Sequence, residues 1–381
     1  MGGNMKKFFH IIGQYIRHTD IWLWLICLSF SIFSLVLLAG IAHTGFFKDV
    51  TLKRIGVQGI ASCLGVICAI GISKFDYHIY TKLWKLHTAG AYLLIILTFI
   101  VGKGTLERPG DKSWFQLPFG MTFQPSELLK ISFILTLAYH IYTVREHLNI
   151  PSHLIGLCIH GAIPVLLIHI QGDDGSAIVF GCIFVAMMFA AGLYWRYILA
   201  AAGAAIIAAP LLWFFVMNDF QRQRFLILYV PGLASTQGDY YQQYRGALAI
   251  GSGQIWGKGI FSDNHSYVPA ANTDFIFAFI GESLGFVGCL AVVLGLVFLC
   301  SRILADGHRA RDLQGRLICT GVFAMIAAQS IINIGMCVSL LPVIGITLPF
   351  LSAGGSSAAI TYLGIGLVLS VYMNTSKSIF D

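Results

Sequence analysis

Long apolar runs, separated by short polar segments, recur along the whole chain. A run of about 20 apolar residues is long enough for an α-helix to cross the hydrocarbon core of a bilayer. Transmembrane β-strands would instead give short segments of alternating apolar and polar residues, which the chain does not show. The pattern predicts ten membrane-spanning helices, at Ile21–Ile41, Lys53–Ile72, Leu83–Gly102, Gln124–Thr143, His153–Ile170, Gly175–Ala191, Leu193–Met217, Asp274–Ser301, Leu317–Leu341 and Ser356–Met373.

The composition agrees with a membrane protein. Hydrophobic residues occupy 57% of the 381 positions and charged residues only 11%, whereas a soluble domain carries about 25% charged residues. A soluble enzyme, a disordered chain and a secreted disulfide scaffold are therefore excluded. The nine cysteines fall mostly inside apolar runs without a metal-binding spacing, and we interpret them as packing residues.

The basic residues between the spans predict the orientation of the chain. Ten spans place both termini on one side, and with that side inside, the inner segments hold 13 Lys and Arg residues and the outer segments hold 10. Without the four in the longest outer segment the ratio is 13 to 6, which favours cytoplasmic termini. We therefore predict one all-α polytopic membrane domain over residues 1–381, with a long extracellular loop at residues 218–273, between helices 7 and 8.

The net charge predicts anionic partners. Lys and Arg number 24 against 17 Asp and Glu, a formal charge of +7. Lipid headgroups or a phosphorylated substrate would fit this charge. Because the chain has no soluble basic domain, nucleic acid is not predicted as a partner.

Ionisable residues within or beside the spans are candidate functional residues, because they are costly in a bilayer. In Gln124–Lys130, Pro125 suits the first turn of a helix, and Glu127 and Lys130 are three residues apart and can pair. The pair has two interpretations, an ion pair that fixes helix packing and a direct role with substrate. Asp173 and Asp174, at the start of the sixth span, could cap that helix or hold a cation.

The eighth span begins beside another acid. Thr273 or Asp274 could cap its first turn, or Asp274 could act as a general base at the membrane surface. Glu282 lies about 12 Å deeper at a rise of about 1.5 Å per residue. Gly281 and Gly285 match GxxxG, a pattern that permits close helix contacts.

The long loop and the segment after the ninth span offer anion-binding groups. Glycines near Lys258 would let backbone N–H groups approach an anion, unless the loop is simply solvated. Residues 342–355 are apolar but rich in helix breakers, so we predict a re-entrant outer loop with Ser352, Ser356 and Ser357 beside a pocket, or else a tight packed turn. The basic residues of the long loop are Arg222, Arg224, Arg245 and Lys258.

Taken together, these segments resemble the SEDS family of RodA and FtsW. The resemblance runs from about Trp114 to the C-terminus, and the order of the motifs makes it specific. It rests on Gln124–Lys130, Asp173 with Gly175–Ala177, Gln221–Arg224, Ala249–Gly253 with Gly257–Gly259, Thr273–Glu282 and Leu341–Ser357.

Several positions depart from the family pattern. The family's Pro-Glu-x-His before Thr-Asp-Phe is here Pro269–Asn272, and Gly-Glu-Glu is Gly281–Ser283. Gln-Pro-Asp-Leu-Gly becomes Gln171–Gly175, and Ser-Tyr-Gly-Gly becomes Ser352–Gly355. The family's Gln-Ser before Ala-Ile-Gly-Ser-Gly aligns with Arg245-Gly246. These differences indicate a divergent member, while the family's essential acid is retained as Asp274.

The resemblance implies a multi-pass protein of the bacterial plasma membrane that polymerises lipid II into peptidoglycan at the extracytoplasmic face, with a class B penicillin-binding transpeptidase as partner. On this hypothesis Asp274 takes the proton of the acceptor hydroxyl. The four loop bases would stabilise the departing pyrophosphate, and a divalent cation, Mg²⁺ or Mn²⁺ with Asp173 as a ligand, could assist. Glu127, Lys130 and Ser356 would shape the cavity. The alternatives are a lipid II flippase and a non-catalytic scaffold for the transpeptidase.

Overall fold

The computed structural model describes residues 13–46, 50–104, 112–116, 122–217 and 239–376, together with positions 219, 222, 225, 226 and 228. Each of the ten predicted spans coincides with one helix, to within a few residues at most ends. The helices are α2 (Ile21–His43), α3 (Leu52–Ser73), α5 (Trp84–Val101), α6 (Pro125–Thr143), α7 (Pro151–Ile170), α8 (Asp174–Ala190), α9 (Trp195–Leu211), α12 (Ile276–His308), α13 (Leu313–Cys337) and α14 (Gly355–Ser376).

The all-helical membrane fold is confirmed. Within the described ranges, eight helices are long and apolar enough to cross a membrane. The other two predicted spans are α6, which carries Glu127 and Lys130, and the 17-residue α8. The shorter elements are α4 (Tyr77–Lys82), η2 (Arg145–His147), η3 (Leu212–Val216), α11 (Asp239–Ser252) and the antiparallel strands β1 (Phe115–Gln116) and β2 (Thr122–Phe123).

Local signals explain where several helices begin. Pro125 and Pro151 occupy the first positions of α6 and α7, where the missing N–H of proline is not needed. Asp20, Asp173 and Asp312 precede α2, α8 and α13, and each side chain accepts a hydrogen bond from a backbone N–H of the first turn.

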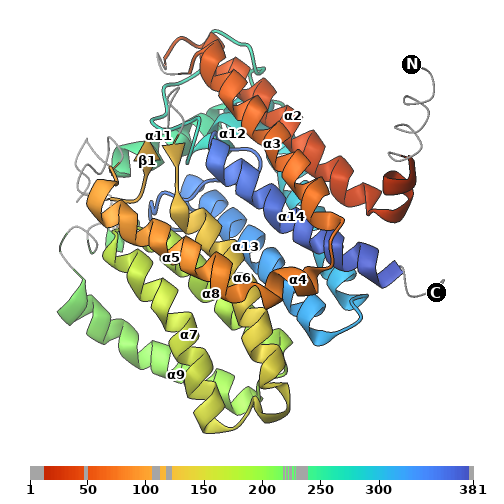
Figure 1. The fold of residues 1–381 in the computed structure, drawn as a ribbon. Coiled ribbons are helices and arrows are strands. Elements are labelled where there is room, and N and C mark those ends of the chain that lie inside the picture. Colours follow the sequence, from red (N-terminus) through yellow and green to blue (C-terminus); the bar gives the residue numbers. More distant parts are fainter. Residues whose placement is uncertain are drawn as a thin grey trace.

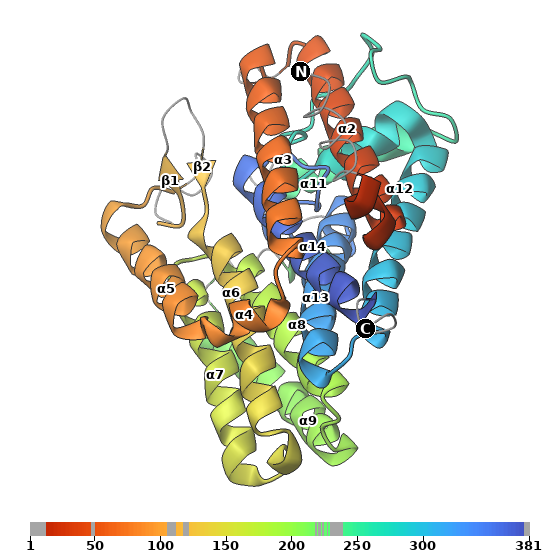
Figure 2. The same cartoon turned by 45° about the vertical axis from the view of Figure 1, so that its right-hand side comes forward.

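Helices α13 and α14 form the centre of the bundle, and α9 lies at its edge (Figures 1 and 2). Helix α13 packs against α6, α8 and α12, and α14 packs against α3. Glycines allow the closest approach: a Cβ added at Gly65 would lie 3.0 Å from the Cα of Ala359, and one at Gly366 would lie 2.8 Å from the Cα of Ala69. Helices α3 and α14 therefore touch through small residues, as membrane helices commonly do.

The described part of the chain begins and ends at the same end of the bundle, which we call the terminal end. The Tyr15 hydroxyl lies 2.8 Å from the Ser73 hydroxyl, and the Ser370 hydroxyl donates to the Phe75 carbonyl. Both contacts lie where α3 ends, as an even number of spans requires. We call the opposite end, with α11 and the strands, the loop end (Figure 1). That the terminal end is cytoplasmic stays a prediction.

Two helix caps at the terminal end are joined through one histidine. His78 Nδ1 lies 2.7 Å from Asp76 Oδ1, and His78 Nε2 lies 2.7 Å from Asp312 Oδ2. Asp76 caps α4 and Asp312 caps α13. Burial alone would lower the pKa of His78, but the hydrogen bonds and charges of the two aspartates outweigh burial and raise that pKa. The imidazolium form of His78 therefore holds α4 to α13.

We expect this contact to make stability depend on pH. Because the folded pKa of His78 is raised, its contribution is fully present below the unfolded pKa of about 6.5 and is lost as pH rises through the folded pKa. The thermal midpoint of the detergent-purified protein should fall over this range, and it should fall less for His78→Gln. His43→Gln, which alters a more exposed His–Asp pair, is the control. An unchanged pH slope in His78→Gln would contradict the assignment.

Candidate functional site

Asp274 lies at the loop end, immediately before α12. The helix begins at Ile276, and its N-cap residue is Phe275, without a side-chain cap hydrogen bond. Neither Thr273 nor Asp274 is the N-cap, so the capping interpretation of these two residues is wrong. The half-buried Asp274 is instead held through its backbone carbonyl, which accepts a hydrogen bond from Asn333 Nδ2 of α13 at 2.8 Å.

The segment between α13 and α14 is irregular backbone packed inside the protein. Leu348, Phe350 and Leu351 are buried, and its polar groups bind neighbouring elements. The Ser352 hydroxyl donates to the Thr273 carbonyl at 2.6 Å, and Gln58 of α3 accepts from the Gly354 N–H at 3.1 Å. Such backbone is tolerated at membrane depth only where protein partners satisfy it. That residues 342–355 form a re-entrant loop in the membrane stays a prediction.

Residues 344–346 contact both α8 and Asp274. Gly175 of α8 packs against them, since a Cβ there would lie 2.8 Å from Ile346 Cδ1. A Cβ at Gly345 would lie 3.6 Å from Asp274 Oδ2, and the positive φ of 78° at this residue favours glycine. One short segment therefore touches both Asp274 and the first turn of the helix that Asp173 caps.

Asp173 is tied to α6 as well as to α8. Its Oδ2 accepts a hydrogen bond from Gln124 Nε2 at 2.7 Å, and its Oδ1 accepts from the Ser176 N–H at 2.9 Å. Asp174 points elsewhere, with its Oδ1 2.5 Å from His169 Nδ1. The described residues contain no group of three or more His, Cys, Asp or Glu side chains arranged to hold a metal ion. A cation at Asp173 stays a prediction.

Glu127 and Lys130 form the predicted ion pair. Lys130 Nζ donates to Glu127 Oε1 at 2.7 Å, and the two side chains are 0% and 6% exposed. The pair lies in the first turns of α6, directly after Gln124, which binds Asp173. The structure shows that the two residues form a buried ion pair within α6. A role of the pair with substrate stays a prediction.

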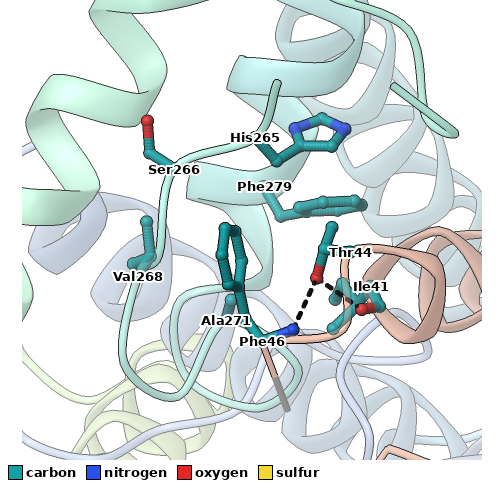
Figure 3. A pocket seen from close by; sticks show the side chains of 8 residues that line it. All are labelled: Ile41, Thr44, Phe46, His265, Ser266, Val268, Ala271 and Phe279. Carbon is teal, nitrogen blue, oxygen red and sulfur yellow. Dashed lines mark hydrogen bonds between the residues drawn. The ribbon is translucent and has the colours of Figure 1, made fainter. Parts of the chain in front are cut away.

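Lys258 is bound by Glu282 of α12. Lys258 Nζ donates to Glu282 Oε1 at 2.6 Å, and the same carboxylate accepts from the Ser266 N–H at 2.9 Å. His265 Nδ1 lies 3.2 Å from Glu282 Oε2, and its ring lies over Phe279 beside a cavity of about 10 Å³ (Figure 3). This cavity has room for about one water molecule and is far too small for a lipid-linked sugar. Glu282 thus anchors this part of the loop to α12. That Lys258 stabilises a departing pyrophosphate stays a prediction.

The glycines around Lys258 serve contacts with α12. The N–H groups of Lys258 and Gly259 donate to the carbonyls of Glu282 and Ser283. At Gly285 the helix is kinked, with a φ of 66°, and the N–H groups of Phe286 and Val287 bind the carbonyls of Gln254 and Ile255. Gly281 therefore makes a close helix contact, since a Cβ there would lie 3.3 Å from the Cα of Ile250 in α11, whereas Gly285 approaches the loop at Ile255 and Gly257. The amides of Lys258 and Gly259 bind protein carbonyls.

The remaining predicted bases are separate. Arg222 Nε donates to the carbonyl of Trp213, in η3, at 2.9 Å, and Arg245 Nε donates to the Tyr267 carbonyl at 2.8 Å. Arg224 lies outside the described residues. Ser356 is half-buried in the first turn of α14. The structure thus brings Gln124 to Asp173, and it brings the 344–346 segment to both Gly175 and Asp274.

Two contributors were missed by the sequence analysis. Asn333 is 0% exposed and donates to the carbonyls of both Asp274 and Ile346, at 2.8 and 2.7 Å. Gln58, which is 3% exposed, binds both Ser352 and Gly354. Each is a polar residue in the middle of a predicted span, and such a residue is a functional candidate by default. The signal was therefore present in the sequence, but it was followed within the spans only for charged residues.

Asn333→Leu should loosen the segment that carries Asp274. The change keeps a similar volume but removes the amide donor of the Ile346 and Asp274 carbonyls, of which the second keeps only the weak thiol donor of Cys337 at 3.5 Å among its donors in the described residues, so we expect a loss of about 1–3 kcal/mol in stability. Catalytic activity should fall as well, because Asp274 and residues 344–346 share this donor. Ser330→Ala is the matched control, since the Ser330 hydroxyl donates to the Ile326 carbonyl of its own helix. Normal stability and turnover in Asn333→Leu would exclude a positioning role.

Comparison with known proteins gives the same family across the chain. A family model described as “Cell cycle protein”, of the FtsW, RodA and SpoVE type, matches residues 17–377. The “Probable peptidoglycan glycosyltransferase FtsW” of Geobacter metallireducens is 33% identical over 334 residues, which cover 86% of each chain. The “Peptidoglycan glycosyltransferase MrdB” of Escherichia coli (strain K12) is 34% identical over 292 residues, 75% of this chain and 78% of that protein.

Solved structures show the same fold. A crystal structure of the rod shape determining protein RodA of Thermus thermophilus matches with a TM-score of 0.66 and 26% identity, covering 93% of this chain and 96% of that chain. A chain from a structure described as “Structural coordination of polymerization and crosslinking by a peptidoglycan synthase complex” matches with a TM-score of 0.76 and 25% identity, covering 94% and 98%. The family, the RodA-like fold and the enzyme class predicted from the sequence are confirmed.

Proposed function

Because this chain belongs to the FtsW, RodA and SpoVE family and is a multi-pass membrane peptidoglycan glycosyltransferase, we propose that it polymerises lipid II with Asp274 as the general base. The observation that supports this proposal is the way in which Asp274 is held. Its carbonyl is bound by α13, the preceding Thr273 carbonyl is bound by Ser352, and its carboxylate lies beside Gly345. A carboxylate on so constrained a backbone is suited to proton transfer, which requires a fixed geometry.

The reaction joins a sugar hydroxyl to an anomeric carbon whose leaving group is a lipid-linked pyrophosphate. Asp274 would take the proton of the acceptor hydroxyl as the new glycosidic bond forms and the bond to the pyrophosphate breaks. Positive charge must then stabilise the departing pyrophosphate. Our candidates for this positive charge are Arg222, Arg224 and Arg245. Lys258 would contribute as well, while it stays paired with Glu282. A divalent cation near Asp173 is compatible with this chemistry, because carboxylate and amide oxygens suit Mg²⁺ and Mn²⁺.

The lipid tails of the substrate explain why the enzyme is built within the membrane. Polyprenyl chains stay in the bilayer, so the reacting ends must reach the protein laterally, at the membrane surface. We place the active site at the extracytoplasmic face, on the loop end. One of the similar chains comes from a structure of a peptidoglycan synthase complex in which polymerization and crosslinking are coordinated. This supports a partner of the class B penicillin-binding type, which would crosslink the strands that this chain makes.

Incubation of the purified full-length protein with labelled lipid II in detergent tests the proposal. Polymeric glycan is the expected product, and adding a glycan-cleaving enzyme to the product should return it to disaccharide units. Movement of lipid II across vesicle membranes without polymer would indicate a flippase. Neither product would indicate a scaffold for the transpeptidase, and both of these results would contradict the proposed polymerase.

A further inference from the structure

A carboxylate without a hydrogen-bond partner is buried at the terminal end of α12. Asp306 is 0% exposed, and neither of its side-chain oxygens has a partner within the described part of the chain. A buried charge of this kind is very costly unless it is paired or neutralised. Native structures contain few such groups, and each requires a specific explanation.

A second carboxylate lies beside it. Asp20 caps α2: its Oδ1 accepts hydrogen bonds from the N–H groups of Trp22 and Leu23, and its Oδ2 accepts from Arg302 Nε at 3.0 Å and from Arg302 Nη2. Asp306 follows Arg302 by four residues and so lies on the same face of α12. Asp20 and Arg302 are both charged neighbours of Asp306. If both carboxylates were ionised, these two acids and the guanidinium of Arg302 would together carry one uncompensated negative charge.

We propose that Asp306 is a proton-binding site: it keeps its proton at neutral pH and, as a neutral carboxylic acid, donates a hydrogen bond to Asp20. The hydrogen bond made by this proton would hold α2 against α12 at the terminal end. Asp306 is the acid to which we assign the proton, because its two oxygens accept no hydrogen bond from the described residues, whereas those of Asp20 already accept four.

A metal ion is a weaker explanation for the same charge. The described residues assemble no group of three or more His, Cys, Asp or Glu side chains, and Arg302 already supplies a positive charge to Asp20. The other ionisable groups around the two acids offer no further carboxylate. They are Arg302 and the exposed Arg309 of α12, Cys27 of α2, Cys319 of α13 and, beside Arg302, Tyr372 of α14.

Asp306→Asn tests the proposal, because asparagine mimics the protonated acid in shape and can donate to Asp20. The thermal midpoint of the full chain in detergent is measured between about pH 5 and pH 8, above the pKa of about 3.9 of an aspartate in an unfolded chain. Since the native state would hold one more proton than the unfolded state, the stability of the natural protein should fall as pH rises. Asp306→Asn should lose this part of the slope and should unfold about 2–4 °C higher at the alkaline end.

His78 contributes a slope of the same sign to both proteins, so the difference between the two curves isolates Asp306. Glu146→Gln, at a side chain that is 75% exposed, is the control and should follow the natural protein. The proposal is overturned if Asp306→Asn keeps the natural slope or unfolds at a lower temperature at every pH. A rise in the natural protein's midpoint with Na⁺ or Mg²⁺ at fixed ionic strength, absent from Asp306→Asn, would assign the site to a cation and would also overturn it.

A measurement on the natural protein covers the case in which Asp306→Asn does not fold. An infrared spectrum at neutral pH should contain the carbonyl stretch of a protonated carboxylic acid, shifted by D₂O. Its absence would overturn the proposal without any variant. Where Asp306→Asn does fold, the same band should be missing from its spectrum.

Discussion

Purified Asp274→Asn protein should fold normally and form no detectable polymer from lipid II. Asparagine has the same shape as aspartate but cannot accept a proton, and the loss of a positioned general base typically lowers a rate by about 10²–10⁴-fold. Ser352 and Asn333 donate hydrogen bonds to the backbone carbonyls of Thr273 and Asp274, and these two contacts persist in the variant. Polymer length and initial rate are measured with labelled lipid II, alongside the thermal midpoint.

Asp263→Asn is the matched control for this experiment. Asp263 belongs to the same segment before α12, but its side chain is 92% exposed and pairs with His43, so its variant should polymerise at the natural rate. Full activity in Asp274→Asn would remove Asp274 from the mechanism. If Asp274→Asn loses activity because it unfolds, Asp274→Glu is the second test. This variant keeps a carboxylate base and should retain part of the rate.

Lys130→Met should destabilise the protein by about 3–5 kcal/mol, because it leaves the Glu127 carboxylate buried without its partner. The double variant Glu127→Gln with Lys130→Met removes both charges, and it should recover most of this loss. Unfolding in detergent, followed for the two single variants and the double variant, gives the coupling between the residues as a double-mutant cycle. The lipid II assay on the double variant then separates packing from chemistry.

The pair Arg145–Glu146 provides the comparison for a surface contact. Its side chains are 45% and 75% exposed, with 3.8 Å between Nη2 and Oε1, so Arg145→Met should change stability by no more than about 1 kcal/mol. Equal effects of Lys130→Met and Arg145→Met would mean that the α6 pair is dispensable. A folded double variant without polymerase activity would instead support the role of the pair with substrate.

The helices could be predicted from the sequence because a bilayer imposes a simple rule. Every apolar run must satisfy its own backbone hydrogen bonds, and the positions of Pro125 and Pro151 fix where two helices begin. The Glu127–Lys130 pair followed from the same logic, since three residues on a helix bring side chains onto one face. Asp274 could be selected by its place in a family pattern, although spacing alone also allowed a helix cap.

Contacts between distant segments could not be predicted in this way. The glycines near Lys258 suggested an anion site, but the amides of Lys258 and Gly259 bind α12, because the break at Gly285 leaves carbonyl and N–H groups of the helix available to the loop. Lys258 itself looked like an exposed base until the fold placed Glu282 against it. Asn333 and Gln58 each bind two backbone groups that are far away in sequence, and only the three-dimensional arrangement identifies those partners.

The kink at Gly285 also has a mechanical consequence. A continuous α-helix is a stiff rod, but a residue with non-helical φ and ψ angles interrupts the ladder of hydrogen bonds that makes it stiff. The short N-terminal piece of α12 is bonded to the loop, and the long C-terminal piece packs against α2 at Gly295 and against α13 at Gly307. We expect that bending of the N-terminal piece, as substrate enters or product leaves, would be absorbed at one residue without a matching movement of the C-terminal piece.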